Sequence, residues 1–394
     1  MNPPLSLVEF SIAPVRGGVE EHVLTLLRGL DKSLFRLAYV CPAELIEKLS
    51  GDVPPEVEMV PLRLESPLDV AGSWRLATIL RRLKADIFHA HMFQASFAGT
   101  PTAWACGVPA VIETPHVREQ WRTGWIKSHY YIDRLIGRFV DHYIAVSEAN
   151  ARYLVEVKRL PASKISVIPN GCDVSSFDPH RPAPRELKQR LGFDGADPVL
   201  VVGARLEPQK GHRVLIKALP LVLEHFPNVK LVCAGDGSLR GELEAMMREH
   251  GLEHVIRFVG YQSAMAEWLA LADIVVLPSF FEGMPLIALE ALAAARPVVA
   301  TATDGTVEVV IDGETGLTAK PGDPRELATA ILRLLRDPAL ARRLAAAGRA
   351  RVLARFSMAQ QVQSTQALYI RTWQESAQGM AARQRRICTS AGMN

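Results

Sequence analysis

The chain has 394 residues, which is long enough for two domains that each bury a core of their own. Apolar residues make up 48% of the sequence and charged residues 22%, and the formal net charge is only +3. These values are typical of a soluble globular protein and exclude the concentrated basic character of a nucleic-acid binder. No apolar run reaches the roughly 18 residues of a membrane span, and the N-terminus carries no signal-peptide pattern.

The cysteines are few and far apart in the sequence. Their odd number and wide spacing predict neither a metal site nor a disulfide framework. A reducing cytoplasm is the compartment we expect for such a chain. The five are Cys41, Cys106, Cys172, Cys233 and Cys388.

Short apolar runs alternate with helix-period segments through the first part of the chain. A loop containing Gly17 and Gly18 lies between a strand at 5–10 and a helix at about 19–30. This alternation predicts a mostly parallel sheet with helices on both faces. Further strands are predicted at 37–40, 57–62, 86–90, 110–113 and 142–146, and helices notably at 73–83 and 148–157.

A Pro-rich stretch then separates this region from a second strand–helix series. We predict an N-terminal domain at 1–177, a linker at 178–197 and a C-terminal domain at 198–356. A last helix at 357–377 and a disordered tail at 378–394 complete the chain. The second series of strands is predicted at 199–202, 229–234, 255–259, 274–277 and 298–300. The fold class is therefore α/β, with two Rossmann-like doubly wound domains.

The stretch from Asp273 to Glu290 is the most informative. An apolar run at 274–277 predicts a buried strand, and Pro285 begins an Ala- and Leu-rich helix that lasts to about Ala295. Glu282 then lies at the carboxyl edge of a sheet, where open α/β folds bind ligands. The start of the helix offers free N–H groups to an anion such as a diphosphate.

Basic residues and glycines occur in two other loops that follow predicted strands. Arg205 and Lys210 follow the first strand of the second domain, where fixed cations can bind the oxygens of an anion such as a diphosphate. Gly17 and Gly18 precede a helix, which allows the backbone to approach a phosphate. Taken alone, such residues are more often solvated cations and plain turns.

The motifs together resemble glycosyltransferase family 4, whose members are retaining enzymes of GT-B architecture with two Rossmann-like domains facing across a cleft. The similarity covers about 17–369. It rests on Glu-Gly-x-Pro-x-x-x-x-Glu between Glu282 and Glu290, on the segment from Gly203 to Gly211, on 297–301 and on 312–317.

The resemblance implies a role for each matching residue. Glu290 would hold the ribose of a nucleotide-diphosphate sugar, Glu282 the sugar hydroxyls, and Arg205 and Lys210 the diphosphate. His116 matches the active-site histidine of the family, although Val117 follows it where a small or acidic residue is usual. The remaining donor-binding residues implied are Gly17, Gly18, Gly235, Tyr261, Gly283, Met284, Pro285 and Leu286. Family members of this type need no metal cofactor.

Several further residues have a plainer interpretation. Asn170, Gly171 and Asp173 resemble a family segment at the domain junction and are predicted to form a hinge turn. His89 and His91 are two apart on a strand and share a face, but a metal site would need a third ligand, so a structural or cleft-lining role is favoured.

The segment from Arg118 to Phe139 interleaves aromatic residues with cations. This composition suits peripheral contact with an anionic membrane surface or a lipid-linked acceptor at the inner face of the cell membrane. The alternative is an acceptor-side helix whose cations are simply solvated.

The sequence predicts a retaining glycosyltransferase that moves a hexose-type sugar from a UDP- or GDP-sugar to an acceptor hydroxyl, with no nucleic acid as partner. The acceptor would be a glycan or glycolipid in polysaccharide, lipopolysaccharide or glycolipid synthesis. The alternatives are a nucleotide-sugar epimerase of the same fold and a non-catalytic nucleotide-sugar-binding subunit. The base, sugar, acceptor and oligomeric state stay open.

Overall fold

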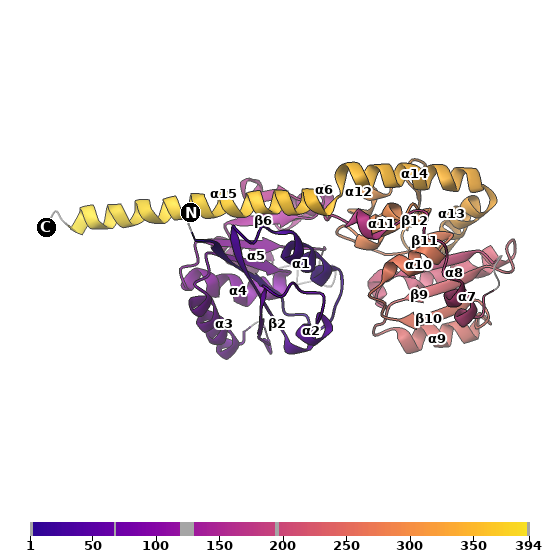
Figure 1. Cartoon of the computed structure of the whole chain (residues 1–394), viewed down its shortest axis with the longest axis horizontal. Helices are drawn as coiled ribbons and strands as arrows, with labels where there is room; N and C mark the ends of the chain where they lie inside the picture. Colours follow the sequence, from indigo (N-terminus) through magenta and orange to yellow (C-terminus); the bar gives the residue numbers. More distant parts are fainter. Residues whose placement is uncertain (1–2, 67, 119–129, 194–196, 392–394) are drawn as a thin grey trace. The chain divides into compact units, whose positions relative to one another are not determined.

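The computed structural model describes residues 3–66, 68–118, 130–193 and 197–391 of the chain (Figure 1). The chain divides into two compact units. The first contains Met1–Pro169 together with Ala359–Asn394, and the second contains Asn170–Met358. Both are α/β units built on parallel sheets, as the sequence predicts.

The described part of the first unit holds a seven-stranded sheet in the order β3-β2-β1-β4-β5-β6-β7. All neighbouring strands in it are parallel. The strands are β1 (Leu5–Phe10), β2 (Phe35–Cys41), β3 (Glu58–Pro61), β4 (Ile87–His91), β5 (Ala110–Thr114), β6 (His142–Ala145) and β7 (Ile165–Val167). Its helices are α1 (Gly18–Gly29), α2 (Ala43–Lys48), α3 (Val70–Leu83), α4 (Phe93–Ala105), α5 (Tyr130–Ile136) and α6 (Glu148–Arg152), followed by a π-helical turn at Tyr153–Val157 and, much later, by α15 (Met358–Ala391).

The second unit repeats this plan with six strands among its described residues, in the order β10-β9-β8-β11-β12-β13. They are β8 (Val199–Gly203), β9 (Lys230–Ala234), β10 (Ile256–Gly260), β11 (Ile274–Leu277), β12 (Val298–Thr301) and β13 (Leu317–Ala319). The helices are α7 (Arg185–Leu191), α8 (His212–Leu223), α9 (Arg240–Glu249), α10 (Met265–Leu271), α11 (Leu286–Ala293), α12 (Thr306–Val309), α13 (Pro324–Arg336) and α14 (Pro338–Arg355). Helix α13 packs against α8, and α14 packs against α11.

In each sheet the strand order reverses between two central strands that are neighbours in the sheet but not in the sequence. Strands β1 and β4 are neighbours in the first unit, and β8 and β11 are neighbours in the second. An aspartate just before β4 and β11 secures each pairing: Asp86 accepts a hydrogen bond from the N–H of Ser6 at 2.8 Å, and Asp273 accepts one from the N–H of Val199 at 2.8 Å. Such reversals are the points at which doubly wound sheets bind ligands.

The strands are mostly apolar because helices cover both faces of each sheet. All four residues of β11 are buried, as are all five of β4. One apolar cluster in the second unit joins the central strands to α8 and α13, and a cluster in the first unit joins β1, β2 and β4 to α3 and α4. Continuous apolar runs of this kind are typical of parallel sheets.

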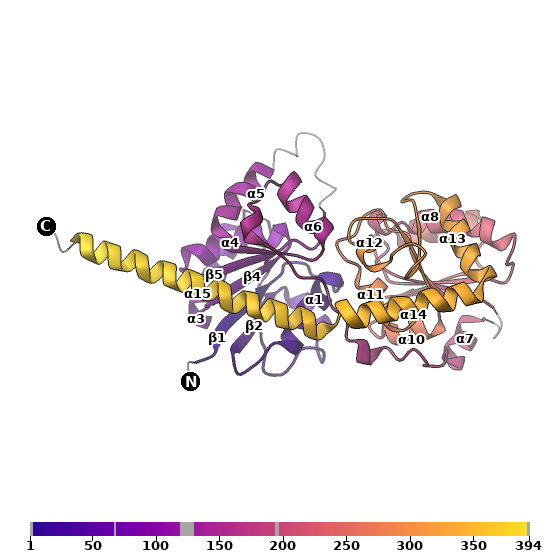
Figure 2. The same ribbon diagram turned by 90° about the horizontal axis from the view of Figure 1, so that it is seen from above.

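Helix α15 belongs to the first unit and lies along it (Figure 2). Its Tyr369 is fully buried and contacts Glu9 and His89 of the central strands. Near its start, Val362 packs so closely on Gly29 of α1 that a Cβ added there would lie 2.6 Å from Val362 Cγ2. The C-terminal helix is therefore an integral part of the first unit.

Two boundaries and one strand differ from the sequence prediction. The units separate at Pro169 rather than at residue 177, because the backbone of Cys172 bonds to that of Phe356 and Met358 in the second unit. Helix α15 continues to Ala391 instead of ending at 377, in a segment rich in Ala, Gln and Arg, which are good helix formers. Strand β13 was missed because it is only three residues long.

The described cysteines Cys41, Cys106, Cys172 and Cys233 are free thiols. A search of the helices in the described ranges finds none with both the length and the apolar character that crossing a bilayer requires.

Candidate functional site

Four loops at the carboxyl ends of the second sheet carry the predicted donor residues. Arg205 and Lys210 follow β8, Gly235 follows β9, Tyr261 follows β10 and Glu282 follows β11. Because β8 and β11 are neighbours, the loops with Lys210 and Glu282 meet where the strand order reverses.

Lys210 and Glu282 form a largely buried ion pair at this point. The Lys210 Nζ lies 2.6 Å from Glu282 Oε1, and the two side chains are only 18% and 8% exposed. The buried hydroxyl of Ser279 donates to the same oxygen at 2.7 Å. Both hydrogen bonds that the described residues donate to this carboxylate end on Oε1, so Oε2 is the oxygen available to accept a hydroxyl group from a ligand.

The backbone of the β8 loop is packed directly on that of the β11 loop. Gln209 accepts a hydrogen bond from the N–H of Phe280, and its side-chain amide donates to the carbonyl of Phe281, both at 2.8 Å. Gly211 has a φ of 69°, and a Cβ there would lie 1.9 Å from the carbonyl oxygen of Pro278. Only glycine allows this approach, so Gly211 fixes the position of the neighbouring Lys210.

Helix α11 begins directly after the β11 loop. Gly283, Met284 and Pro285 are buried, and Pro285 is the N-cap of the helix rather than its first residue. Glu290 is half-buried in the second turn of α11. The side-chain amide of the buried Asn170 donates to the carbonyl of Met284 at 3.0 Å, so the predicted hinge residue also holds the start of this helix in place.

The β9 and β10 loops are arranged differently. A Cβ at Gly235 would lie 2.0 Å from the carbonyl oxygen of Ala204, so a glycine lets the β9 loop pack on the β8 loop. Tyr261 is half exposed and Arg205 is exposed. These two side chains are therefore accessible to a ligand.

In the first unit, the predicted His116 lies in a buried cluster of four histidines. Two of the others, His89 and His91, come from β4, and His22 comes from α1. The His116 ring centroid lies 5.2 Å from that of His91 and 4.6 Å from that of His22. His116 keeps an exposed fraction of 8%, whereas His91 keeps 1%.

A single buried carboxylate organises this cluster. Glu9 Oε2 accepts from His91 Nε2 at 2.7 Å and lies 3.0 Å from His89 Nδ1. The Tyr369 hydroxyl donates to Glu9 Oε1 at 2.9 Å, and His89 Nε2 is 2.7 Å from the Thr114 hydroxyl.

The ionisation of these groups follows from burial and from their neighbours. Burial raises the pKa of Glu9, but the facing His89 and the hydrogen bonds from both histidines lower it, so its pKa lies well below the ordinary value. Burial lowers the pKa of His91 to about 4, with His89 adding to the effect and Glu9 opposing it. Burial also places the pKa of His116 well below its usual range, helped by His22 and His91. At neutral pH Glu9 is ionised and both His91 and His116 are neutral.

Two sets of three side chains within the described ranges are close enough to share a metal ion. One is His22, His91 and His116, and the other is Glu9, His89 and His91. The second set supplies the third ligand that the spacing of His89 and His91 alone did not identify. Both sets share His91, whose two ring nitrogens bond to Glu9 and His116.

Gly17 and Gly18 lie where the sequence places them, between β1 and the start of α1. Gly17 is the N-cap of the helix in an extended conformation, and Gly18 is exposed with open space around its Cα. The loop therefore presents backbone N–H groups at the start of α1, at the same edge of the sheet as the histidine cluster.

Of the segment from Arg118 to Phe139, residues 119–129 lie outside the described residues, including Trp121 and Trp125. In the described part, Tyr131 is 71% exposed and the Arg134 guanidinium lies 4.2 Å from its ring centroid. Phe139 instead packs on Trp104 with ring centroids 5.1 Å apart.

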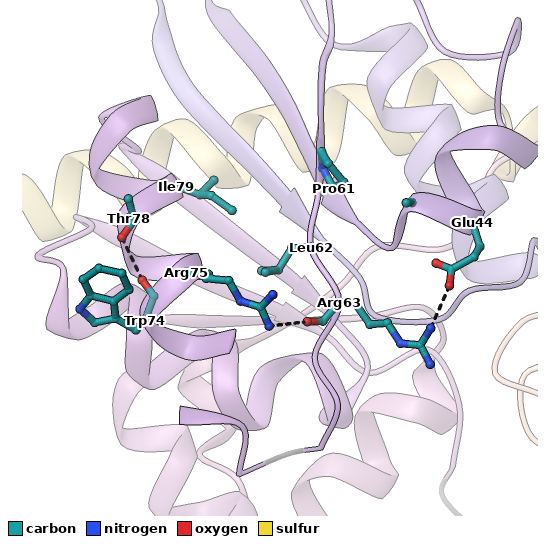
Figure 3. A pocket seen from close by; sticks show the side chains of 9 residues that line it. Glu44, Pro61, Leu62, Arg63, Trp74, Arg75, Thr78 and Ile79 are labelled. Carbon is teal, nitrogen blue, oxygen red and sulfur yellow. Dashed lines mark hydrogen bonds and ion pairs between the residues drawn. The ribbon is translucent and has the colours of Figure 1, made fainter. Parts of the chain in front are cut away.

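A cavity of about 520 Å³ lies on the surface of the first unit, away from the predicted site residues (Figure 3). The Arg63 guanidinium beside it is paired with Glu44, and Arg75 donates to the carbonyl of Arg63. The lining residues are Ala43, Glu44, Pro61, Leu62, Arg63, Trp74, Arg75, Thr78 and Ile79. None of them was predicted to have a role, and its cations are partly neutralised by these contacts.

Comparison with known proteins agrees with this arrangement. The model of the family Glycosyltransferase Family 4 matches residues 16–176, and that of Glycosyl transferases group 1 matches residues 184–351. The chain is 32% identical over 299 residues to a glycogen synthase of Mycobacterium tuberculosis, a match covering 74% of this chain and 70% of that protein. The chain belongs to glycosyltransferase family 4.

One further relative of this glycosyltransferase and one solved structure of similar fold are informative. The chain is 31% identical over 297 residues to a GDP-mannose-dependent monoacylated alpha-(1-6)-phosphatidylinositol monomannoside mannosyltransferase of Corynebacterium glutamicum. This match covers 72% of the chain and 75% of that protein. The fold of this chain matches the crystal structure of HepE from Anabaena in complex with UDP and glucose, with a TM-score of 0.81 and 21% identity. The match covers 92% of this chain and 98% of the HepE chain. The two parallel-sheet Rossmann-like units are those of GT-B glycosyltransferases.

The structure of the glycosyltransferase adds residues that sequence reasoning missed. Ser279 contacts Glu282, whereas Glu9, His22 and Tyr369 belong to the histidine cluster. Glu9 could have been found from its pattern, because a carboxylate inside the apolar strand Leu5–Phe10 needs buried partners.

Proposed function

We propose that this glycosyltransferase moves a hexose-type sugar from a nucleotide-diphosphate donor, a UDP- or GDP-sugar, to an acceptor hydroxyl with retention of anomeric configuration. The observation that carries the proposal is the Lys210–Glu282 pair at the β8–β11 reversal, beside the start of α11. It supplies a cation for a diphosphate and a carboxylate oxygen for a sugar hydroxyl within one unit.

We propose roles for the remaining donor-side residues from their match to the family motifs. Glu290 in α11 would hold the ribose hydroxyls, and Arg205 would add two parallel hydrogen bonds to the diphosphate. The N–H groups at the start of α11 would receive phosphate oxygens, as helix N-termini do. Tyr261 and Gly235 would border the base and the phosphates.

The leaving diphosphate accumulates negative charge as the glycosidic bond breaks. A cation already held at 2.6 Å from its carboxylate partner needs little reorganisation to face that charge. We infer that Lys210 is retained by Glu282 before the donor arrives and is shared with the diphosphate afterwards. This arrangement neutralises the leaving group with protein cations, and the proposal includes no metal cofactor.

The donor class has support from similar proteins. HepE, whose fold this chain shares, binds UDP and glucose, and the relative from Corynebacterium glutamicum is GDP-mannose-dependent. We propose that the acceptor is a glycan or glycolipid of polysaccharide, lipopolysaccharide or glycolipid synthesis, and that His116 is the catalytic contribution of the first unit.

Proton NMR of the reaction tests this proposal. The chain is incubated with UDP-glucose, GDP-mannose and other nucleotide sugars, with and without simple glycoside acceptors. Release of nucleoside diphosphate with an anomeric proton of unchanged configuration supports it. Inverted product, or epimerised donor with no diphosphate released, contradicts it. Glu282→Gln and Arg205→Ala should each lower turnover, whereas Arg342→Ala, which changes an exposed arginine of α14, should not.

We also propose peripheral membrane contact at the cytoplasmic face through the described part of the segment from Arg118 to Phe139. The supporting observation is the exposed pair of Tyr131 and Arg134, an aromatic ring stacked under a cation. Flotation with anionic liposomes at low salt tests it. Flotation that weakens in Arg134→Glu supports the contact, and a protein that stays at the bottom of the gradient contradicts it.

A further inference from the structure

The histidine cluster of the first unit contains more ionisable groups than a single active-site histidine needs. Glu9, His91 and His116 form a chain of hydrogen bonds: Glu9 Oε2 to His91 Nε2 at 2.7 Å, and His91 Nδ1 to His116 Nε2 at 3.0 Å. Glu9 and His91 are 0% and 1% exposed, so water does not compete for these bonds. A buried, fully satisfied polar chain of this kind fixes where each proton lies.

The proton positions follow from Glu9. An ionised carboxylate only accepts hydrogen bonds, so His91 must carry its proton on Nε2. Neutral His91 then has a lone pair on Nδ1. Two nitrogen lone pairs cannot face each other at 3.0 Å, so His116 must carry its proton on Nε2 and donate it to His91. The second nitrogen of His116, Nδ1, is left without a proton.

We infer that Glu9 and His91 are positioning residues that hold His116 as a neutral hydrogen-bond acceptor through Nδ1 for a sugar hydroxyl. The inference rests on the proposed function for its substrate, because it assigns to His116 the direction of its contact. A neutral imidazole accepts a hydrogen bond from a hydroxyl group without placing a positive charge beside the sugar. An imidazolium would instead donate through both nitrogens.

Helix α15 completes the same network from the far end of the sequence. The Tyr369 hydroxyl donates to Glu9 Oε1 at 2.9 Å and lies 2.6 Å from His89 Nδ1, and Gln361 lies 2.9 Å from His22 Nδ1. Glu9 thus accepts a hydrogen bond on each of its two oxygens, which keeps it ionised although it is buried. The C-terminal helix contributes to the electrostatics of the histidine cluster as well as to the packing.

A bound metal is the competing explanation, because His22, His91 and His116 offer three nitrogens within 4.8 Å of one another. A metal ion between His91 Nδ1 and His116 Nε2 would replace the proton that the inference places there. The distance of 3.0 Å between these nitrogens fits an N–H···N hydrogen bond, and two nitrogens bound to one metal ion lie about as close. We assign a proton to this position, and the metal content of the protein decides between the two explanations.

Nitrogen-15 NMR of histidine-labelled protein tests the inference without any substrate. Long-range proton–nitrogen correlations distinguish a protonated ring nitrogen from an unprotonated one, and signals are assigned by their loss in His116→Phe and His91→Phe. The expected result is a protonated Nε2 and an unprotonated Nδ1 for both residues at pH 7. A protonated Nδ1 on His116 overturns the inference. So does a stoichiometric metal, measured by emission spectrometry, that is lost in His116→Phe.

Kinetics provide the second measurement. Glu9→Gln and His91→Phe should each lower kcat about 10- to 100-fold, the effect of losing a hydrogen bond to a charged or catalytic group, while KM for the donor changes little. The control is Tyr39→Phe, which also removes a buried hydrogen bond, the 2.6 Å contact with Ser11, in the same sheet. Equal losses in Tyr39→Phe and Glu9→Gln would overturn the positioning role. If the proposed reaction itself is wrong, no variant turns over donor and the NMR result still decides the inference.

Discussion

Replacement of Gly211 by alanine tests the packing of the two donor loops. The φ of Gly211 is 69°, a conformation that costs a residue with a Cβ about 1 kcal/mol or more. The added Cβ would lie 1.9 Å from the carbonyl oxygen of Pro278 and 2.8 Å from its carbonyl carbon. Carbon and oxygen atoms do not approach within 3.0 Å without displacement, so the loops must separate by about 1 Å.

The expected loss is larger than the conformational cost alone. Adding the strain of separating two hydrogen-bonded backbones brings the estimate for the second unit to about 3 kcal/mol or more. A loss of 1 kcal/mol lowers the melting temperature by about 2–4 °C for a unit of this size, so Gly211→Ala should melt at least about 6 °C lower. Lys210 moves with the loop, so nucleotide affinity should fall as well.

Gly251→Ala is the matched control. Gly251 lies in the same unit with a φ of 66°, but a Cβ there would meet nothing within 4 Å. It should lose only the conformational cost, about 1 kcal/mol, and bind nucleotide normally. Scanning calorimetry and titration with nucleoside diphosphates measure both effects. Equal melting temperatures for the two variants would refute the packing argument.

Three further predictions concern other contacts. The ring nitrogens of the buried His212 have no hydrogen-bond partner among the described residues, and burial lowers the pKa of this histidine to about 4. The folded state therefore loses stability as the pH falls from about 6.5 towards 4, by about 2 kcal/mol at pH 5. Calorimetry at pH 7 and pH 5 should show a weaker pH dependence for His212→Leu than for the wild type, and an equal dependence would contradict the prediction. Gly29→Ala should lower the melting temperature because the added methyl group clashes with Val362. Adding Val362→Ala to this variant should restore part of the loss. A double variant that melts no higher than Gly29→Ala would contradict the packing of α15 on α1. Lys210→Met leaves the Glu282 carboxylate without its cation and should lower the free energy of unfolding, measured by chemical denaturation, by about 1–3 kcal/mol. Glu282→Gln keeps both hydrogen-bond partners and should lower it less. The reverse order would contradict the ion pair.

The sequence was most informative about the strands and the loops that follow them. The predicted strands at 274–277 and 5–10 coincide with β11 and β1, because strands buried on both faces are mostly apolar, as Ile274–Leu277 is throughout. The family motif then located Glu282 and Lys210. Their contact at 2.6 Å, however, depends on β8 and β11 being neighbours, which local patterns do not reveal.

The histidine cluster was harder to predict. Its members come from β1, β4, α1, the loop after β5 and α15, and Glu9 and Tyr369 are separated by 360 positions in the chain. No local spacing encodes such a contact. The identity of Glu9, a carboxylate in a mostly apolar strand, was the one signal that a buried polar network had to exist.

We propose that the second unit holds a nucleotide diphosphate between Lys210, Arg205 and Glu290. The most direct test is a thermal-shift panel of UDP, GDP, ADP and TDP in EDTA, on wild type and on Glu290→Ala. A nucleotide present at 100 times its dissociation constant should stabilise the protein by about 2.7 kcal/mol. We predict a clear shift for UDP or GDP that is lost in Glu290→Ala. No shift for any nucleotide, or an equal shift in the variant, would contradict the donor site described here.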